Sequence, residues 1–174
     1  PEAFRQDTSE NTELIRKVVI DGPRTDVTDT TTLQYDTNGR LQSITNALSQ
    51  TLTVNSYDTG GRITKITRPT GMTVEYEYHP RGWVTKITEK LATKTLSGAT
   101  ENQVRVTEYA YDEVGNVERV TYPDGSYYDF YYNAQDLPFR VDNANGEMMW
   151  YDYDDEGNIT REREIGRASG RERR

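Results

Sequence analysis

One pattern recurs along this chain and constrains its fold more than any other feature. A tyrosine followed by aspartate, two variable residues, glycine, a polar residue and a hydrophobic residue is seen clearly at residues 57–63. Six copies are present, with tyrosines at positions 35, 57, 78, 111, 132 and 153, spaced by 21 or 22 residues except for one interval of 33. A fixed period of this length is typical of repeat architectures, in which each unit buries its hydrophobic face against its neighbours.

Two turn signals in each repeat predict one β-hairpin per repeat. The first is Tyr-Asp-x-x-Gly, and the second is a turn such as Pro123-Asp124-Gly125, whose glycine precedes the next repeat tyrosine by seven residues. Pro, Asp, Asn and Gly supply the backbone conformations that hairpins need. Between the turns side chains alternate, so that Tyr128, Phe130 and Tyr132 share one face. The sequence therefore predicts an all-β fold of repeated antiparallel β-hairpins in one continuing sheet.

The recurring residues are predicted to hold the repeats in register. They are Tyr35, Asp36, Gly39, Tyr57, Asp58, Gly61, Tyr78, Gly82, Tyr111, Asp112, Gly115, Tyr132, Tyr153, Asp154 and Gly157. The third copy has His79 in place of aspartate, and the fifth has Asn133 and Asp136 in place of aspartate and glycine. We expect altered turns in these two copies. Arg40 and Arg62 are interpreted as partners for carboxylates of neighbouring turns or as solvated surface.

The repeats divide the chain into three parts. Residues 27–164 form the predicted repeat array, and residues 1–26 are irregular or a partial preceding repeat. The long interval contains an insertion at about residues 91–102, whose Thr, Lys, Ser and Gly content is typical of a surface loop. Residues 165–174 break the repeat and form a basic tail that does not look native, so they are excluded from the fold prediction.

Composition excludes several classes of protein. Hydrophobic residues make up only 33% of the 174 residues, but 13 tyrosines supply amphipathic core material. No run approaches the ~18 apolar residues of a membrane helix. The net charge of -8 repels phosphate backbones and disfavours nucleic-acid binding. The absence of cysteine excludes thiolate chemistry and Cys-based metal sites, and no cofactor is expected.

For the candidate catalytic and metal-binding residues, a structural role explains the sequence better than a chemical one. His79 is the only histidine and occupies a turn position, which argues against a catalytic role. The run Asp152 to Gly157 resembles the start of a calcium-binding loop, but the twelfth position is Arg163 and the phase is explained by the sixth repeat. Weak Ca²⁺ binding is the alternative there. We therefore predict no catalytic residue, no metal site and no enzyme.

Three aromatic residues remain after the hydrophobic face is assigned. Tyr127, Tyr131 and Trp150 alternate with the residues expected in the core, so they are the candidates for contact with a ligand or an enclosed cargo. Stacking of sugar rings on these side chains is the functional alternative to simple packing.

The motif from Tyr57 to Thr67 resembles the YD repeat of bacterial Rhs proteins, and the resemblance covers about residues 27–164. Relatives include the animal teneurins and the C component of insecticidal toxin complexes. The resemblance implies a curved, spiralling sheet that forms a sector of a hollow YD-repeat shell, which in the toxin members encloses a variable C-terminal toxin domain.

The expected function is therefore that of a structural segment of a secreted or surface-displayed bacterial protein. Its partners would be further YD repeats and a C-terminal toxin domain of the same longer chain. The alternative is a cell-surface adhesion array that binds carbohydrate. A hydrolase is the third class, and it would require one carboxylate that is unique among the repeats.

Overall fold

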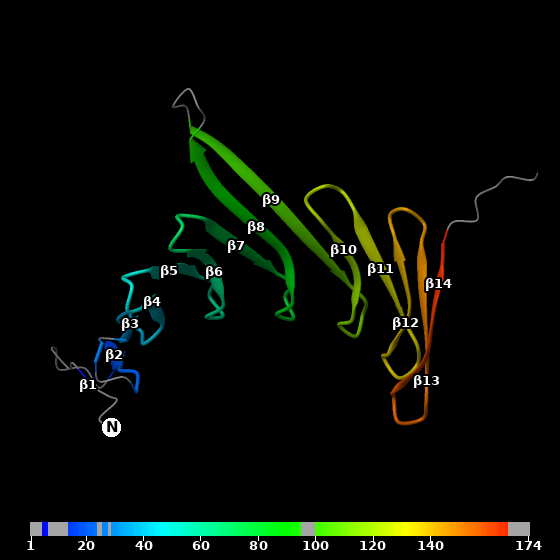
Figure 1. Ribbon diagram of the computed structural model, residues 1–174, viewed down its shortest axis with the longest axis horizontal. Coiled ribbons are helices and arrows are strands. Elements are labelled where there is room, and N and C mark those ends of the chain that lie inside the picture. Colours follow the sequence, from blue (N-terminus) through cyan, green and yellow to red (C-terminus); the bar gives the residue numbers. More distant parts are fainter. Residues whose placement is uncertain (1–4, 7–13, 24–25, 28, 95–99, 167–174) are drawn as a thin grey trace, which may run out of the picture. The chain divides into compact units, whose positions relative to one another are not determined.

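Regularly spaced turns divide the chain into short strands, each of which pairs with its neighbours in sequence (Figure 1). The computed structural model describes residues 5–6, 14–23, 26–27, 29–94 and 100–166. Within these residues there is no helix, and the sheet contains 14 strands whose spatial order follows the chain from β1 to β14. The predicted all-β fold of repeated antiparallel hairpins is confirmed.

The strands have the following bounds: β1 Arg5–Gln6, β2 Lys17–Ile20, β3 Thr31–Tyr35, β4 Leu41–Thr45, β5 Thr51–Tyr57, β6 Ile63–Thr67, β7 Thr73–Tyr78, β8 Val84–Lys94, β9 Thr100–Tyr111, β10 Val117–Thr121, β11 Tyr127–Tyr132, β12 Pro138–Asn143, β13 Met148–Tyr153 and β14 Ile159–Ile165. The chain forms two units, residues 1–76 with 88–104, and residues 77–87 with 105–174. Each unit is described on its own below.

The first unit buries aliphatic side chains in rows that cross its strands. Residues that pair directly across neighbouring strands are aliphatic in two rows. The first row is Val18, Leu33, Ile44 and Leu52, and the second is Val54, Ile66 and Val74. Val74 is the most deeply buried of these, with 1% of its surface exposed. The opposite face carries hydroxyl pairs such as Thr45 with Thr51, whose oxygens are 2.9 Å apart. One face of this unit is therefore apolar and the other is polar.

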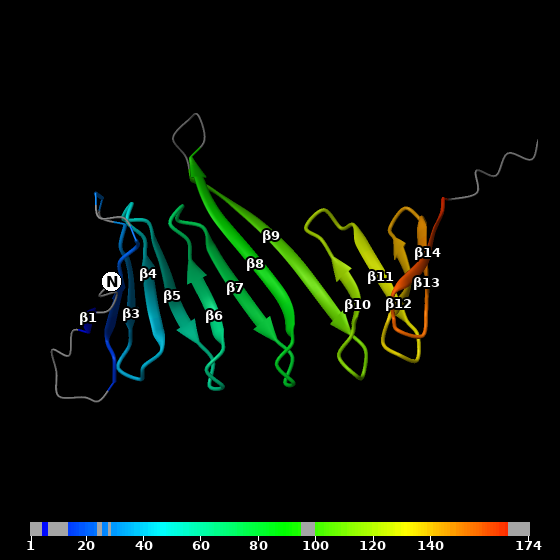
Figure 2. The same cartoon turned by 60° about the horizontal axis from the view of Figure 1, so that its bottom comes forward.

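The second unit uses aromatic residues for the same purpose, and Figure 2 shows its strands β10 to β14 following one another in chain order. Val120 pairs with Tyr128 and Phe130 pairs with Val141, which in turn pairs with Met149. These pairings place Tyr128, Phe130 and Tyr132 on one face of β11, as the alternation in the sequence predicts. Val120 is buried, whereas Tyr128 remains 41% exposed. The second unit thus has a mixed aliphatic and aromatic core face.

A β-bulge follows the repeat turn in every repeat whose register is described. In each case the second residue of the strand after the turn has no partner on the strand before the turn. These unpaired residues are Gln42, Thr64, Glu118, Phe139 and Thr160. A bulge bends its strand and increases the local twist. In the fifth repeat the bulged residue of β12 is Phe139, and its ring contacts that of Trp150 with centroids 5.7 Å apart.

The structure corrects two details of the predicted boundaries. Residues 91–94 and 100–102 were expected in a loop, but they extend β8 and β9 to 11 and 12 residues. The insertion therefore lengthens two strands. Residues 95–99 lie outside the described residues. Ile165 was assigned to the tail, but it is the last residue of β14 and pairs with Met148.

The described residues contain no helix that is long and apolar enough to cross a membrane.

Candidate functional site

The six turns that begin at the repeat tyrosines share one hydrogen-bonded geometry. We call them the repeat turns and count the tyrosine as position one, so that aspartate is position two, glycine position five and the polar residue position six. In the turn from Asp36, its Oδ1 accepts the backbone N–H groups of Asn38 and Arg40, both at 2.9 Å. Asp58, Asp112, Asn133 and Asp154 make the equivalent pair of bonds. The recurrent acid therefore closes a turn.

The copies that depart from the motif keep the same turn, contrary to our expectation. His79 replaces the carboxylate with its Nδ1, which accepts the backbone N–H of Arg81 at 3.2 Å. Asp136 takes the place of glycine in the fifth copy and adopts a positive φ of 59°. Aspartate tolerates this left-handed conformation better than most residues. The backbone bonds between positions two, five and six are also preserved in both copies.

In five of the six repeat turns the side chain at position six contacts the side chain at position two. Arg40 Nη2 lies 2.8 Å from Asp36 Oδ2, and Arg62 Nε lies 2.6 Å from Asp58 Oδ2. Each arginine therefore pairs with the carboxylate of its own turn, whereas we expected a carboxylate of a neighbouring turn or a solvated position. Where histidine occupies position two, position six is Trp83, which stacks on the imidazole with ring centroids 5.0 Å apart and an interplanar angle of 12°. The two positions have changed together from an ion pair to an aromatic pair.

The same position-six side chain also contacts the turn of the next repeat. The guanidinium of Arg40 lies 4.7 Å from the ring centroid of Tyr57. Trp83 packs on the following turn so closely that a Cβ added to Gly115 would lie 2.5 Å from its Cζ2 atom. In the next two repeats, Asn116 donates to Asp136 at 3.1 Å and Leu137 packs against Gly157. Position six therefore joins adjacent repeats.

The repeat tyrosines form a second link between repeats. Each of four tyrosine hydroxyls donates to the backbone carbonyl of the residue that opens the second strand of the preceding repeat: Tyr57 to Leu41, Tyr111 to Val84, Tyr132 to Val117 and Tyr153 to Pro138, at 2.5–2.9 Å. Burial raises the pKa of Tyr111 and of Tyr132, as expected for hydroxyls held away from water. The alternation of side chains along the sequence does not predict which backbone carbonyl groups accept these hydrogen bonds.

Removing one of these hydroxyls should measurably weaken the array. We expect Tyr132→Phe to lower the free energy of unfolding by about 1 kcal/mol, because the ring stays packed while the carbonyl of Val117 loses its donor. Tyr128→Phe in the same strand is the control, with an expected change below ~0.5 kcal/mol, since 41% of the Tyr128 surface is exposed. Equilibrium urea unfolding measures both, and equal losses would contradict the role of the Tyr132 hydroxyl.

Hydrogen bonding makes the turn carboxylates sensitive to acid. The backbone N–H of Arg40 lowers the pKa of Asp36, and that of Arg62 lowers the pKa of Asp58. At Asp154 the side-chain amide of Asn158 is the main cause of the lowered pKa. For Asp112, burial opposes the shift but the bonds from Asn116 and Gly115 outweigh it, and the pKa is again lowered. A lowered pKa in the folded state means that the ionised form stabilises the fold.

The sign of this linkage predicts loss of stability in acid. The stabilisation is complete above the ordinary aspartate pKa of 3.8 and is lost as the pH falls through the lowered folded values. Asp154→Asn should reduce the dependence of the urea midpoint on pH between about 2 and 5, because Asn46 shows that asparagine closes this kind of turn. Asp155→Asn, at an exposed neighbouring carboxylate, is the control. An unchanged pH dependence in Asp154→Asn would contradict the assignment.

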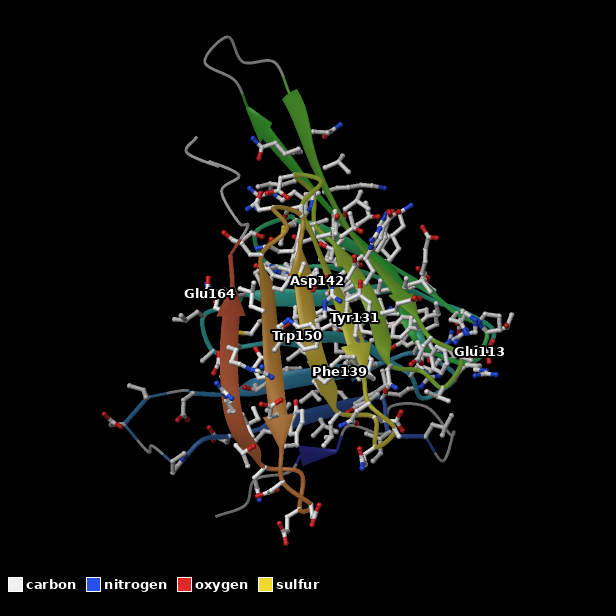
Figure 3. The ribbon with its side chains drawn as sticks, turned by 90° about the vertical axis from the view of Figure 1, so that its right-hand side faces the viewer. Glu113, Tyr131, Phe139, Asp142, Trp150 and Glu164 are labelled. Carbon is white, nitrogen blue, oxygen red and sulfur yellow. The ribbon has the colours of Figure 1, made fainter. Side chains whose placement is uncertain are left out.

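The strand register puts the three predicted contact residues on one face of the second unit, and two of them, Tyr131 and Trp150, are labelled in Figure 3. The guanidinium of Arg119 lies 4.4 Å from the ring centroid of Tyr127, and that of Arg140 lies 4.7 Å from Tyr131 and 5.3 Å from Trp150. We call this surface the aromatic–arginine face, comprising Tyr127, Tyr131, Trp150, Arg119, Arg140 and Arg163. A hollow of about 360 Å³ between Arg119 and Tyr131 lies on it.

Each arginine of this face is paired with an aspartate. Arg119 Nη2 is 2.7 Å from Asp129 Oδ2, and the bond from Arg119 to this carboxylate raises the pKa of Arg119. Arg140 pairs with Asp142 and Arg163 with Asp152 in the same way. The charges of Arg119, Arg140 and Arg163 are therefore balanced by carboxylates, and each of the three rings has a cation against it. The known contacts of this face are those of a packed, charge-balanced surface.

His79 closes its own turn by accepting the backbone N–H of Arg81. The hydroxyls of two serines, which could in principle act as nucleophiles, have local partners: Ser56 Oγ is bonded to Thr64, and Ser126 Oγ donates to Asp124. The stretch that resembles a calcium loop forms the sixth repeat turn, closed by Asp154. Among the described residues, no group of three or more His, Cys, Asp or Glu side chains is placed to hold a metal ion.

Comparison with known proteins agrees with the repeat architecture. Residues 35–71 and 57–94 match the RHS repeat family model. Residues 35–94 are therefore similar to the RHS repeat, in agreement with the resemblance that the Tyr-Asp-x-x-Gly motif predicts. A comparison of the sequence with curated proteins gives no match.

Solved structures share the fold at low sequence identity. The crystal structure of TcdB2-TccC3-Cdc42 matches with a TM-score of 0.64 and 15% identity over 92% of this chain. That of TcdB2-TccC3-TEV matches with 0.63 and 16% over 94%. A Tc holotoxin pore of Photorhabdus luminescens matches with 0.51 and 14% over 87%. This chain spans about 10% of each of those chains.

Proposed function

We propose that this chain is a sector of the wall of a bacterial Rhs-type protein, secreted or displayed at the cell surface, whose β-shell encloses a C-terminal toxin. The observation that carries the proposal is the pair of links that joins adjacent repeats at four places. The recurring tyrosine hydroxyls and position-six side chains connect one repeat to the next. A wall isolates its contents only when its backbone hydrogen bonding is continuous, and these links hold that continuity.

The nature of the recurring residues supports a wall over an enzyme. A catalytic acid or base is normally unique, whereas the aspartates here recur and each accepts backbone N–H groups of its own turn. The similar solved structures belong to TcdB2-TccC3 complexes and to a toxin pore, which favours the toxin-associated members of the family. Because this chain spans about 10% of those chains, the rest of the shell and the cargo would come from further parts of a longer chain.

Protease protection of the cargo tests the proposal. The coding sequence that contains this segment is expressed in full, and the domain downstream of the repeats is followed during limited proteolysis. We expect that domain to resist digestion in the wild type and to become cleavable in Val74→Asp, which disrupts the wall, but not in Val114→Asp at an exposed turn. Digestion of the downstream domain at equal rates in all three proteins, or the absence of any such domain, would refute encapsulation.

The convergence of three aromatic side chains favours carbohydrate binding as the second candidate. Tyr127, Tyr131 and Trp150 lie on one face, and aromatic rings stack on sugars, but Arg119 and Arg140 already cover one side of these rings. A glycan array separates the two functions. A specific hit that is lost in Trp150→Ala and kept in Tyr122→Ala would favour an adhesion array, and silence of the wild type would remove this candidate.

A further inference from the structure

The core face of the second unit contains a hollow of about 720 Å³, which we call the tyrosine hollow. Tyr128 lines it and pairs with Val120, so the hollow opens on the face opposite the aromatic–arginine face. Val120 also pairs with Tyr109, and alternation along β9 puts Arg105 on the same side as Tyr109. The residues that line the hollow are Arg105, Tyr122, Pro123, Asp124, Ser126 and Tyr128.

Two tyrosine rings form a corner of the tyrosine hollow. The ring centroids of Tyr122 and Tyr128 are 6.1 Å apart and the ring planes meet at 89°, while 41% of the surface of each residue is exposed. Such a pair presents the face of one ring and the edge of the other to the space beside it. Aromatic rings prefer edge-to-face contacts, so a third aromatic ring can join this corner, whereas a sugar ring stacks flat on a single exposed ring face. The corner therefore favours an aromatic side chain.

The tyrosine hollow also contains a cation without a partner. Arg105 is exposed, and its side chain has no hydrogen bond or ion pair with any residue that the structure describes. The three arginines of the aromatic–arginine face, in contrast, are each paired with an aspartate. The acid of the hollow, Asp124, accepts the backbone N–H of Ser126 at 3.0 Å and its hydroxyl at 2.6 Å, so this carboxylate is held in its own turn. Arg105 is thus left for an external carboxylate, which a guanidinium can bind with two parallel hydrogen bonds.

We propose that the tyrosine hollow binds a peptide in which an aromatic side chain lies beside a carboxylate. The aromatic ring occupies the corner between Tyr122 and Tyr128, and the carboxylate pairs with Arg105. The net charge of -8 repels polyanions, which favours a ligand with a single carboxylate over an acidic polymer. This carboxylate belongs either to an acidic residue next to the aromatic one or to the C-terminus of the peptide. The inference goes beyond the proposed function and stands without it.

NMR titration of the backbone amides of the 174-residue chain tests the chemistry of the ligand. The probe is the capped dipeptide Tyr-Asp, and its controls are capped Tyr-Asn, which lacks the carboxylate, and capped Ala-Asp, which lacks the ring. We expect Tyr-Asp to shift the amides of residues 121–128 and to bind about fivefold more tightly than either control. Equal affinities of the three dipeptides, or no binding of Tyr-Asp, would overturn the inference.

Two further compounds identify the source of the carboxylate. Binding of N-acetyltyrosine more tightly than capped Tyr-Asp assigns the tyrosine hollow to the C-terminus of a peptide, and weaker binding assigns it to an internal aromatic–acidic pair. Both results support a peptide ligand. Methyl glucuronide supplies a carboxylate on a sugar ring, and its binding more tightly than both tyrosine compounds would overturn the assignment to a peptide.

Substitutions in the protein test the position of the site. Arg105→Gln should weaken binding of capped Tyr-Asp about fivefold and bring it to the level of capped Tyr-Asn. Tyr122→Ala should weaken it by a similar factor through loss of the corner. The matched control is Arg161→Gln, at an exposed arginine that pairs with Asp152 on the opposite face, and it should leave the affinity unchanged. An unchanged affinity in Arg105→Gln, or an equal loss in Arg161→Gln, would contradict the site. If the spectrum shows that Tyr122→Ala is not folded, Arg105→Gln decides alone.

Discussion

Replacing Gly115 by alanine is expected to lower the free energy of unfolding by about 2–5 kcal/mol. Two causes act at this residue. Its φ of 110° is rarely adopted by a residue that has a Cβ, and the new Cβ would lie 2.5 Å from Trp83 Cζ2. The indole would have to leave the next repeat turn, which would also disturb its contact with the Tyr111 ring, now at a centroid distance of 5.2 Å.

Gly125→Ala is the control that separates the cost of backbone strain from the cost of the steric clash between adjacent repeats. Gly125 has a similarly positive φ of 82°, but nothing lies within 4 Å of an added Cβ. The backbone strain alone should therefore cost about 1–2 kcal/mol. Both variants are compared by urea unfolding, and a loss at Gly115 no larger than that at Gly125 would contradict the contact between adjacent repeats. In that outcome Trp83 would be shown to move away at little cost.

Introducing aspartate at Val74 should have the other large effect. Val74 is 1% exposed and is paired directly with Ile66, so a carboxylate there would be buried without a partner. We expect a loss of about 3–5 kcal/mol or unfolding of the first unit. The matched control is Val114→Asp, since Val114 is 70% exposed in a turn, and its expected change is below ~0.5 kcal/mol. Circular dichroism during urea unfolding measures both, and similar midpoints would show that the apolar row is not a core.

The hairpins were predictable because their signals are local. Glycine at position five and aspartate at position two specify a turn through residues a few positions apart, and the alternation of side chains assigns the faces. The sequence also contained the co-substitution at positions two and six, since the His79 copy has Trp83 and the Asn133 copy has Leu137 where the others have arginine or asparagine.

Two features were not predictable from local pattern. The tyrosine hydroxyl reaches a carbonyl of the preceding repeat, and this acceptor depends on strand register that a bulge shifts by one residue. Bulges leave no distinct residue type in the sequence here, since Gln42, Glu118 and Phe139 occupy equivalent places. The same limit applies to the aromatic–arginine face. Alternation assigned Tyr127, Tyr131 and Trp150 to one side, but the guanidinium of Arg140 between two of the rings follows from pairing across three strands.

The central claim is that each repeat is stabilised by its neighbours. Urea unfolding of nested chains tests it most directly, with residues 29–166 compared with residues 29–143 and 29–121, which remove one pair of strands at each step. We expect the free energy of unfolding to fall at each step, because every removal takes away a repeat together with its link to the one before it. An equal free energy of unfolding in all three chains would show that the repeats are independent and would contradict the account.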